Sequence, residues 1–303
     1  MDIHSITRHK PSVDDRLTAF LKNKQKSLSL INHWGGDVIT RLLPFVAAGR
    51  TIRGGLLLYT YSLFEKSPPG FVLDAAAALE LFQSGFLIHD DIMDQDATRR
   101  GSPAIYKQYE QAATDKRGTD VDRFGQSMGI NAADLCFFLG YELLGGLPDR
   151  YMHVVQIFSR EFSSVATAQM QDVSASHVPI SFGKADILSL YRYKTARYSF
   201  SLPLTVGALL ANAEKGVIEN MEKLGEHLGL LFQIRDDELD RSVESDRRNR
   251  KQTLASVMTK DELENFKRDL VQNSNDIMRE LPIAEIHKIA LAGLAVFCQN
   301  REK

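Results

Sequence analysis

The sequence lacks several features that would by themselves point to a class of protein. Its 303 residues include only two cysteines, Cys136 and Cys298, which form neither a ligand spacing nor a disulfide framework and therefore fit a reducing compartment. No sign of charge dominates either, because 37 basic residues are set against 39 acidic ones. This balance excludes a chain-wide basic field, so we expect no nucleic-acid partner.

Long uncharged apolar runs are also absent. The best candidate, residues 71–89, is interrupted by Asp74, Glu80 and Gln83, which argues against a membrane-spanning helix. The N-terminal segment MDIHSITRHKPSVDD is too polar for the apolar part of a signal peptide. We therefore expect a cytoplasmic protein with no membrane span.

What the chain does have is an ordinary globular composition with helical periodicity almost throughout. It is 44% hydrophobic and 25% charged, which excludes disorder and low complexity. Apolar residues recur at steps of three and four, no run alternates as a strand would, and we find no linker or repeat. We expect one all-α domain over residues 1–303, with residues 1–14 as a polar N-terminal tail. The predicted helices cover about 15–34, 54–66, 71–95, 126–146, 149–173, 184–213, 217–241, 260–280 and 284–299.

The sequence also marks where these helices should break. The polar stretches Gln111 to Asp122 and Ser242 to Gln252 are predicted loops. Pro203 should kink the helix that contains it, because proline has no backbone N–H to donate. Several helices are apolar nearly all round, as is typical of the centre of a large helical bundle.

Two clusters of aspartate carry the main functional signal, and each closes an apolar helix. The members are Asp90, Asp91 and Asp94 in LIHDDIMD, and Asp236, Asp237 and Asp240 in LFQIRDDELD. Two carboxylates about 4 Å apart repel by about 4 kcal/mol at an effective dielectric constant near 20, so such a cluster favours a cation. Mg²⁺ binds through one or two carboxylates together with waters and substrate phosphates. One cluster alone would more often be a solvated helix end. Two such clusters predict a site in which carboxylates bind Mg²⁺ together with a diphosphate.

Basic residues complete this prediction. Arg99 and Arg100 follow the first cluster in TRRG, Arg50 and Arg53 lie in GRTIRG, and Lys194 lies in YRYKTARY. Arginine is suited to bidentate contacts with phosphate. Each of these residues taken singly is more often a surface charge, and it is their combination with the aspartates that indicates a polyphosphate site.

With these motifs, the chain resembles the trans-prenyltransferases, also called isoprenyl diphosphate synthases, over nearly its whole length. The resemblance implies an isoprenoid synthase helical bundle around a deep central cavity, usually a homodimer, with three Mg²⁺. It also implies head-to-tail condensation of isopentenyl diphosphate with an allylic diphosphate. The departing diphosphate would take the proton, so no side-chain base is expected.

The resemblance assigns roles to individual residues. All six aspartates look like metal ligands, and Arg99 looks like the arginine that binds the allylic diphosphate. The residues that look like ligands of isopentenyl diphosphate are Arg50, Arg53, Gln83 and Arg100. Lys194 and Thr195 match the KT pair, Gln233 matches the glutamine of FQxxDD, Gln169 and Asp172 match GQxxD, and Lys251 matches the lysine of SDxxxxKxT. The implied catalytic group is Asp90, Asp236, Lys194, Thr195 and Gln233, and Lys194 and Lys251 are also implied to bind substrate.

The chain departs from the family pattern in two places. GRTIRG resembles the motif GKRxRP, and Arg53 matches its last arginine, but Arg50 replaces its lysine and Thr51 and Gly54 also differ. The family usually has a longer loop after the second motif, with a glycine–lysine pair that binds the allylic diphosphate. Here DDELD is followed almost at once by SDRRNRK, so that lysine is missing, and Arg241 could substitute for it.

Two residues upstream of the first cluster bear on product length. Phe86 should shorten the channel for the prenyl tail, whereas Gly85 leaves space beside it. In the family, aromatic residues at both positions go with a fifteen-carbon product, so one large and one small residue indicate about twenty carbons, that is, geranylgeranyl diphosphate. Farnesyl diphosphate and a longer product are the alternatives, and Phe86 could equally be an ordinary core residue.

Other functions compete with this prediction. GQSMG at 125–129 matches the nucleophile elbow GxSxG, but no buried strand precedes it. A class I terpene cyclase shares the fold and the first aspartate motif, but the second motif and the arginines favour condensation. A non-catalytic subunit of a heteromeric synthase would be expected to lose metal aspartates; only the missing loop lysine favours it.

Overall fold

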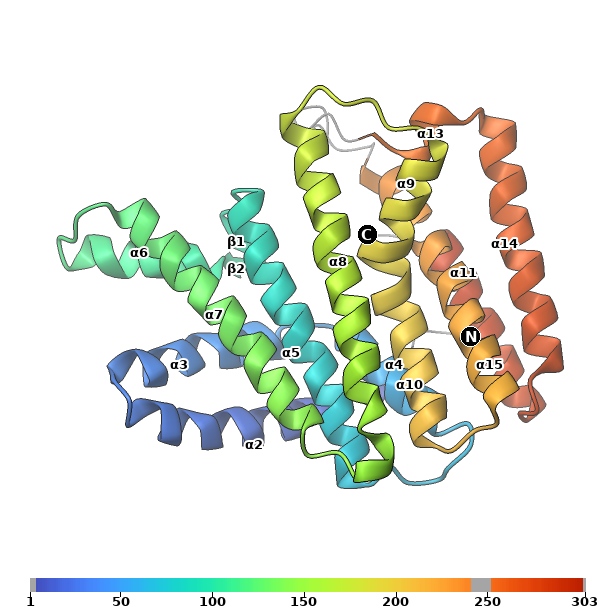
Figure 1. The fold of residues 1–303 in the computed structure, drawn as a ribbon, viewed down its shortest axis with the longest axis horizontal. Coiled ribbons are helices and arrows are strands. Elements are labelled where there is room, and N and C mark those ends of the chain that lie inside the picture. The colour runs from blue at the N-terminus through green and yellow to red at the C-terminus, as the bar shows by residue number, and fades with distance from the viewer. Residues whose placement is uncertain (1–3, 241–251, 302–303) are drawn as a thin grey trace. The chain divides into compact units, whose positions relative to one another are not determined.

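The structure, a computed structural model, describes residues 4–240 and 252–301 (Figure 1). It is almost entirely helical, which confirms the predicted all-α class. The helices are α1 (His4–Thr7), α2 (Lys10–Ser29), α3 (His33–Ala47), α4 (Ile52–Tyr61), α5 (Gly70–Met93), α6 (Ile105–Asp115), α7 (Val121–Leu144), α8 (His153–His177), α9 (Lys184–Tyr191), α10 (Leu202–Leu210), α11 (Lys215–Asp240), α13 (Leu254–Val257), α14 (Lys260–Glu280) and α15 (Glu285–Asn300). A 3₁₀ turn η1 (Asp149–Tyr151), a π-helix η2 (Arg192–Ser201) and the short strands β1 (Thr98–Arg99) and β2 (Ser102–Pro103) complete the described elements.

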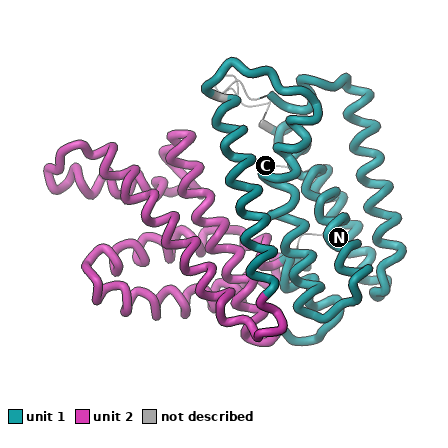
Figure 2. Tube along the Cα trace, in the orientation of Figure 1, with its two compact units in different colours: residues 1–6, 56–68, 153–303 teal, residues 7–55, 69–152 magenta. Residues whose placement is uncertain are grey.

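The packing divides the chain into two compact units (Figure 2). Unit 1 comprises residues 1–6, 56–68 and 153–303, and unit 2 comprises residues 7–55 and 69–152. In unit 1, α11 packs against η2, α10, α14 and α15, and in unit 2, α5 packs along α7 while α6 also packs against α7. The expectation of one domain over residues 1–303 stays a prediction.

Helix α5 is the central helix of unit 2. By length and composition it is the only helix in the described part of the chain that passes as a candidate membrane span, but 72% of its apolar window is buried inside the protein. Such burial is typical of a core helix, so α5 gives no support for a membrane span. Close approach to α7 helps to bury it, since a Cβ at Gly140 would lie 2.8 Å from the Phe82 ring.

Residues 4–14 are helical rather than a tail, so that expectation is wrong for the part described. They form α1 and the start of α2, and both Ile6 and Val13 are buried. Because the segment is mostly polar, its composition gives no sign that these two apolar side chains are buried. The expected loop from Gln111 also begins later, because α6 continues to Asp115. The carboxylate of Asp115 accepts a 2.7 Å hydrogen bond from the side chain of Gln111.

The predicted helix at 184–213 is divided at a place other than the expected kink. A π-helix, η2, follows α9, and Pro203 lies in the first turn of α10. Proline is tolerated in a first turn because the N–H it lacks there has no partner within the helix. The irregular segment is therefore the ten residues before α10, and they include Lys194 and Thr195. π-helical segments occur frequently at functional sites.

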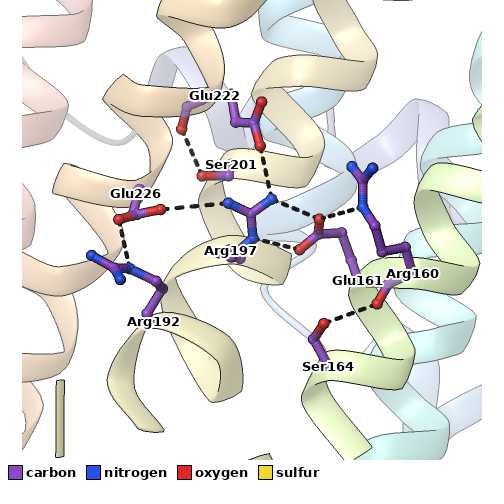
Figure 3. A network of polar contacts seen from close by, with 8 residues as sticks. All are labelled: Arg160, Glu161, Ser164, Arg192, Arg197, Ser201, Glu222 and Glu226. Carbon is purple, nitrogen blue, oxygen red and sulfur yellow. Dashed lines mark hydrogen bonds and ion pairs between the residues drawn. The ribbon is translucent and has the colours of Figure 1, made fainter. Parts of the chain in front are cut away.

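A network of ion pairs holds η2 in place within unit 1 (Figure 3). Arg197 donates to both carboxylate oxygens of Glu161 on α8, at 2.8 and 2.7 Å, and to Glu222 on α11 at 2.7 Å. Glu226, one turn further along α11, accepts a 2.7 Å hydrogen bond from Arg192. Arg197 therefore fixes η2 against α8 and α11 three residues after Lys194.

Candidate functional site

The first aspartate cluster lies at the C-terminal end of α5, in unit 2. Asp94 ends the helix, and its N–H donates to the carbonyl of Asp90 at 2.8 Å. Asp90 is half-buried and Asp94 is exposed, whereas Asp91 is fully buried. The three aspartates therefore differ: Asp90 and Asp94 present their carboxylates toward solvent from one helix face, and Asp91 points into the protein.

Asp91 is bound to the arginine of the TRRG motif. Nε of Arg99 donates to Oδ1 of Asp91 at 2.6 Å, and Nη2 of Arg99 donates to Asp96 at 2.9 Å. The other oxygen of Asp91, Oδ2, is buried and has no hydrogen-bond partner among the described residues. Burial raises the pKa of Asp91 to about 6, although the Arg99 guanidinium opposes this shift. Asp91 thus positions Arg99, and its role as a metal ligand stays a prediction.

A tight turn brings Arg99 and Arg100 to this end of α5. Strands β1 and β2 pair antiparallel through Arg99 and Ser102, and the two turn residues Arg100 and Gly101 have φ values of 55° and 77°. Positive φ at both central positions is the geometry of a type I′ hairpin turn. From it, Nη1 of Arg100 donates to the carbonyl of Phe45 at 2.6 Å, so Arg100 reaches the end of α3.

The GRTIRG loop is held by residues that the sequence analysis assigned to a tail. Nζ of Lys10 donates to the carbonyls of Ala47 and Gly49 at 2.9 and 2.8 Å. Thr51, which has a φ of 55°, donates from Oγ1 to Asp14 at 3.1 Å and accepts from Lys10 at 3.2 Å. Lys10 and Asp14 were missed because nothing local marks a polar residue as the partner of a loop nearly forty positions away.

Glu80 is the most informative residue that sequence reasoning missed. It is buried on α5, and its Oε1 accepts a 2.8 Å hydrogen bond from the N–H of Gly54, at the start of α4. Burial raises its pKa, while the charges of Arg53 and Arg100 act in the opposite direction. The charge of this buried carboxylate therefore interacts with two of the predicted substrate arginines. Its signal was present in the sequence as a lone acid within an apolar helix.

Two other predicted residues of this site have different surroundings. Gln83, one helical turn after Glu80, is buried, while Arg50 is exposed. Unit 2 thus places Arg53 and Arg100 within electrostatic reach of Glu80, and Arg99 against Asp91. It leaves Arg50 at the surface.

Unit 1 contains a pocket of about 200 Å³ lined by the second group of predicted residues. Its polar wall includes Asp172, Tyr191, Lys194, Thr195, Gln233 and Asp237. Lys194 forms an ion pair with Asp172, which joins η2 to α8. The structure therefore places the KT pair, the glutamine of FQxxDD and the aspartate of GQxxD in one pocket.

A chain of hydrogen bonds orients Asp237 in this pocket. Oγ1 of Thr195 donates to Oε1 of Gln233 at 2.7 Å, and Nε2 of Gln233 donates to Oδ1 of Asp237 at 2.9 Å. The hydroxyl of Tyr191 donates to Oδ2 of Asp237 and accepts from the N–H of Leu254 at 3.2 Å. Both oxygens of Asp237 are thus oriented by donors, and Tyr191 joins the site without having been predicted.

The remaining members of the second cluster differ in what the structure describes. Asp236 forms an ion pair with Arg301, whose guanidinium also stacks 3.9 Å from the Phe232 ring centroid. Arg301 was not predicted, because it lies 65 positions along the chain from Asp236 (301 − 236). The side chain of Asp240 and the whole of Lys251 and Arg241 lie outside the described residues.

The described donors fit Mg²⁺ better than a metal that needs a full protein cage. Among residues 4–240 and 252–301, no group of three or more His, Cys, Asp or Glu side chains converges to hold a metal ion. Mg²⁺ needs only one or two carboxylates, with waters and phosphates completing its shell. Asp90, half-buried, and Asp94, exposed one turn later, meet that requirement, and Asp236 presents a partly exposed carboxylate.

Comparison with known proteins identifies the family. Residues 41–255 match the family model for polyprenyl synthetase, and the chain belongs to this family. It is 31% identical over 223 residues to the short chain isoprenyl diphosphate synthase of Methanocaldococcus jannaschii, an alignment that covers 70% of this chain and 62% of that protein. It is 30% identical over 229 residues to the geranylgeranyl diphosphate synthase of Sulfolobus acidocaldarius, covering 71% and 64%. The matches thus span slightly under two thirds of these relatives.

A solved structure supports the fold over the whole chain. The geranylgeranyl pyrophosphate synthase of Corynebacterium glutamicum, crystallised with isoprenyl diphosphate and magnesium, superposes with a TM-score of 0.83 and covers 100% of both chains. The sequence identity is 23%, so this likeness establishes the fold and no more. It confirms the isoprenoid synthase type of helical bundle that the family resemblance implied.

Proposed function

We propose that the protein is a Mg²⁺-dependent prenyltransferase that condenses isopentenyl diphosphate head to tail with an allylic diphosphate and releases diphosphate. The observation that carries the proposal is the end of α5, where Asp90 and Asp94 face solvent beside an Arg99 already fixed by Asp91. Membership of the polyprenyl synthetase family supports it. The C-terminal end of α5 would therefore provide both metal ligands and a guanidinium group to one diphosphate.

The residues of each unit have distinct roles in this proposal. Three Mg²⁺ ions, with Asp90 and Asp94 as ligands in unit 2 and the second cluster as ligands in unit 1, would stabilise charge on the leaving diphosphate. Arg99 would bind the allylic diphosphate, while Arg53 and Arg100, gathered by Glu80, would bind isopentenyl diphosphate. Preorganised cations are effective because they need not reorganise as charge develops on the leaving group.

The pocket in unit 1 would act on the allylic substrate. Lys194, oriented by Asp172, would offer its ammonium to the substrate phosphates, and Thr195 and Gln233 would orient Asp237. Exclusion of water by the surrounding helices would protect an allylic cation from quenching. Lys251 remains a proposed substrate ligand outside the described residues.

The proposed product is a short-chain diphosphate of about twenty carbons, geranylgeranyl diphosphate. Relatives that make geranylgeranyl and farnesyl diphosphate both align with the chain, among them the farnesyl diphosphate synthase of Geobacillus stearothermophilus, 27% identical over 84% of this chain and 85% of that one. Phe86, half-buried one turn before Asp90, supports a short product. Farnesyl diphosphate is the alternative.

We further propose that the protein acts as a cytoplasmic homodimer. Helix α7 exposes large apolar side chains, with Phe138 70% and Ile130 45% accessible. Such a surface favours a second copy as its partner, since closed two-fold dimers are the commonest oligomers. Sedimentation at several protein concentrations would test this, with a monomer at all of them contradicting it.

The decisive test is an assay with purified full-length protein. It receives isopentenyl diphosphate with dimethylallyl, geranyl or farnesyl diphosphate and Mg²⁺, and mass spectrometry sizes the products. We expect one elongated product that disappears when EDTA removes the metal. A cyclised hydrocarbon from one allylic substrate alone would instead place the chain among the cyclases. No product at all would support a non-catalytic subunit that needs a partner.

Tyr191→Phe tests the pocket in unit 1. The variant keeps the ring but removes the hydroxyl that binds Asp237 and Leu254, an interaction worth about 0.5–1.5 kcal/mol. We expect KM for the allylic diphosphate and the Mg²⁺ requirement to rise by about two- to tenfold, measured by steady-state kinetics. The neighbouring, exposed Tyr193→Phe is the control and should match wild type. Equal kinetics in both variants would remove Tyr191 from the site.

A further inference from the structure

One aromatic side chain of α7 covers the face of α5 that leads away from Asp90. The ring of Phe137 lies 5.0 Å from that of Phe86, 5.5 Å from His89 and 6.3 Å from Phe82, measured between ring centroids. Residues three and four apart share a helix face, so Phe82, Phe86 and His89 form one stripe on α5. Phe137 therefore contacts this stripe over two helical turns.

The same ring occupies the space beside Gly85. A Cβ added at Gly85 would lie 2.7 Å from Cε1 and 3.0 Å from Cζ of Phe137. The expectation that Gly85 leaves open space for a prenyl tail is therefore wrong. The Phe137 ring of α7 occupies the place that a side chain at position 85 of α5 would take.

The ring of Phe137 is also backed by further aromatic residues. Phe82, which it stacks on, is fully buried and meets Tyr141 edge-on at 4.9 Å. Gly140 lets the Phe82 ring lie directly against α7. Because packed interiors resist displacement, these neighbours restrict how far Phe137 can swing away from Gly85.

We propose that Phe137 determines product chain length, an inference that rests on the proposed prenyltransferase function. A tail attached to a diphosphate at Asp90 must extend along apolar surface, and Phe86 is the first ring it meets one turn below. Phe137 stands beside Phe86 and adds a second ring, from another helix, next to Gly85. Growth of the tail stops where these two rings meet, and shortening either side chain leaves space into which a longer tail can extend.

The test is the size of the product made by Phe137→Leu and Phe137→Ala, with isopentenyl diphosphate and geranyl or farnesyl diphosphate as substrates. We expect the main product to lengthen by one or two isoprene units, as read by mass spectrometry. The matched control is Phe124→Leu, which alters a ring on the same helix that packs 5.9 Å from Trp34 and 6.4 Å from Tyr109. This control should keep the wild-type product.

A second substitution checks the mechanism through Gly85. In the wild-type background the new methyl group of Gly85→Ala collides with the Phe137 ring and lies 3.0 Å from the carbonyl oxygen of Ala133, whereas in Phe137→Leu the collision with the ring is removed. The double variant should therefore return the product toward wild-type length. If the alanine variant at 137 fails to fold, the leucine variant decides the matter.

The outcomes separate this inference from the proposed function. A folded Phe137→Leu enzyme that makes the wild-type product, or that makes none, overturns the role of Phe137 while the condensation activity of the wild type stands. Wild-type protein that condenses neither geranyl nor farnesyl diphosphate overturns the proposed function itself.

Discussion

Asp90→Asn is expected to lower kcat for condensation by roughly 10²–10³-fold, comparable to removing one group that stabilises developing charge. The amide has nearly the shape of the carboxylate, but it carries no charge to balance a divalent cation. Because Asp90 is only half-buried and lies in the last turn of α5, the fold should persist. Initial rates at saturating Mg²⁺ and both substrates, together with a thermal melt, measure the two effects separately.

A matched control is available on the same helix. Asp74, near the start of α5, pairs with Arg16 at 2.5 Å and lies far from the TRRG turn in sequence. Asp74→Asn should cost some stability and leave kcat close to wild type. Asp236→Asn in the second cluster should behave like Asp90→Asn. Normal turnover in both cluster variants would contradict a metal clamp built from the two motifs.

Local periodicity made the fold class and the positions of the long helices predictable. Apolar residues spaced three and four positions apart indicate helices, and the aspartates at the ends of two of these helices were visible in the sequence. The different burial of neighbouring motif residues was not predictable from the motif alone. Asp91 lies about 100° around α5 from Asp90, and only the packing of the whole unit decides which of the two faces solvent.

Contacts between residues distant in the chain were the main part that sequence could not provide. Lys10 holds the loop at Gly49, Arg301 pairs with Asp236, and Phe137 fills the space at Gly85. Lys10, Arg301 and Phe137 themselves lie in no recognisable motif. Each is selected by how helices pack, so a single sequence contains no local signal that joins the two members of the pair.

The break before α10 shows a third kind of limit. Pro203 predicted a kink at its own position, because it lacks an N–H, but a proline also fits the first turn of a new helix. The chain uses the second solution, and the irregular backbone falls upstream in η2. Arg197 and its glutamate partners stabilise that segment, and the proline alone does not reveal them.

Glu80→Leu is expected to lower the free energy of unfolding by about 1–3 kcal/mol, the usual cost of leaving a buried hydrogen-bonding group without its partner. The N–H of Gly54 would lose its acceptor, and Arg53 and Arg100 would lose a nearby negative charge. Denaturant unfolding measures this loss. Such a large cost could prevent accumulation of the protein, so the functional question needs a milder variant.

Glu80→Gln is that variant, because its amide oxygen can still accept from Gly54 while the negative charge is removed. Without that charge Arg53 and Arg100 lose the attraction that Glu80 exerts on them, so we expect KM for isopentenyl diphosphate to rise by about tenfold, or about 1.4 kcal/mol. KM for the allylic diphosphate should change little, since Arg99 is held independently by Asp91.

Glu110→Gln, which weakens a pair with Lys107 in the same unit, is the control and should alter neither constant. Equal rises for both substrates would mean that Glu80 supports the fold of unit 2 generally. A selective rise for isopentenyl diphosphate would establish that a carboxylate which touches no substrate organises one of the two diphosphate sites.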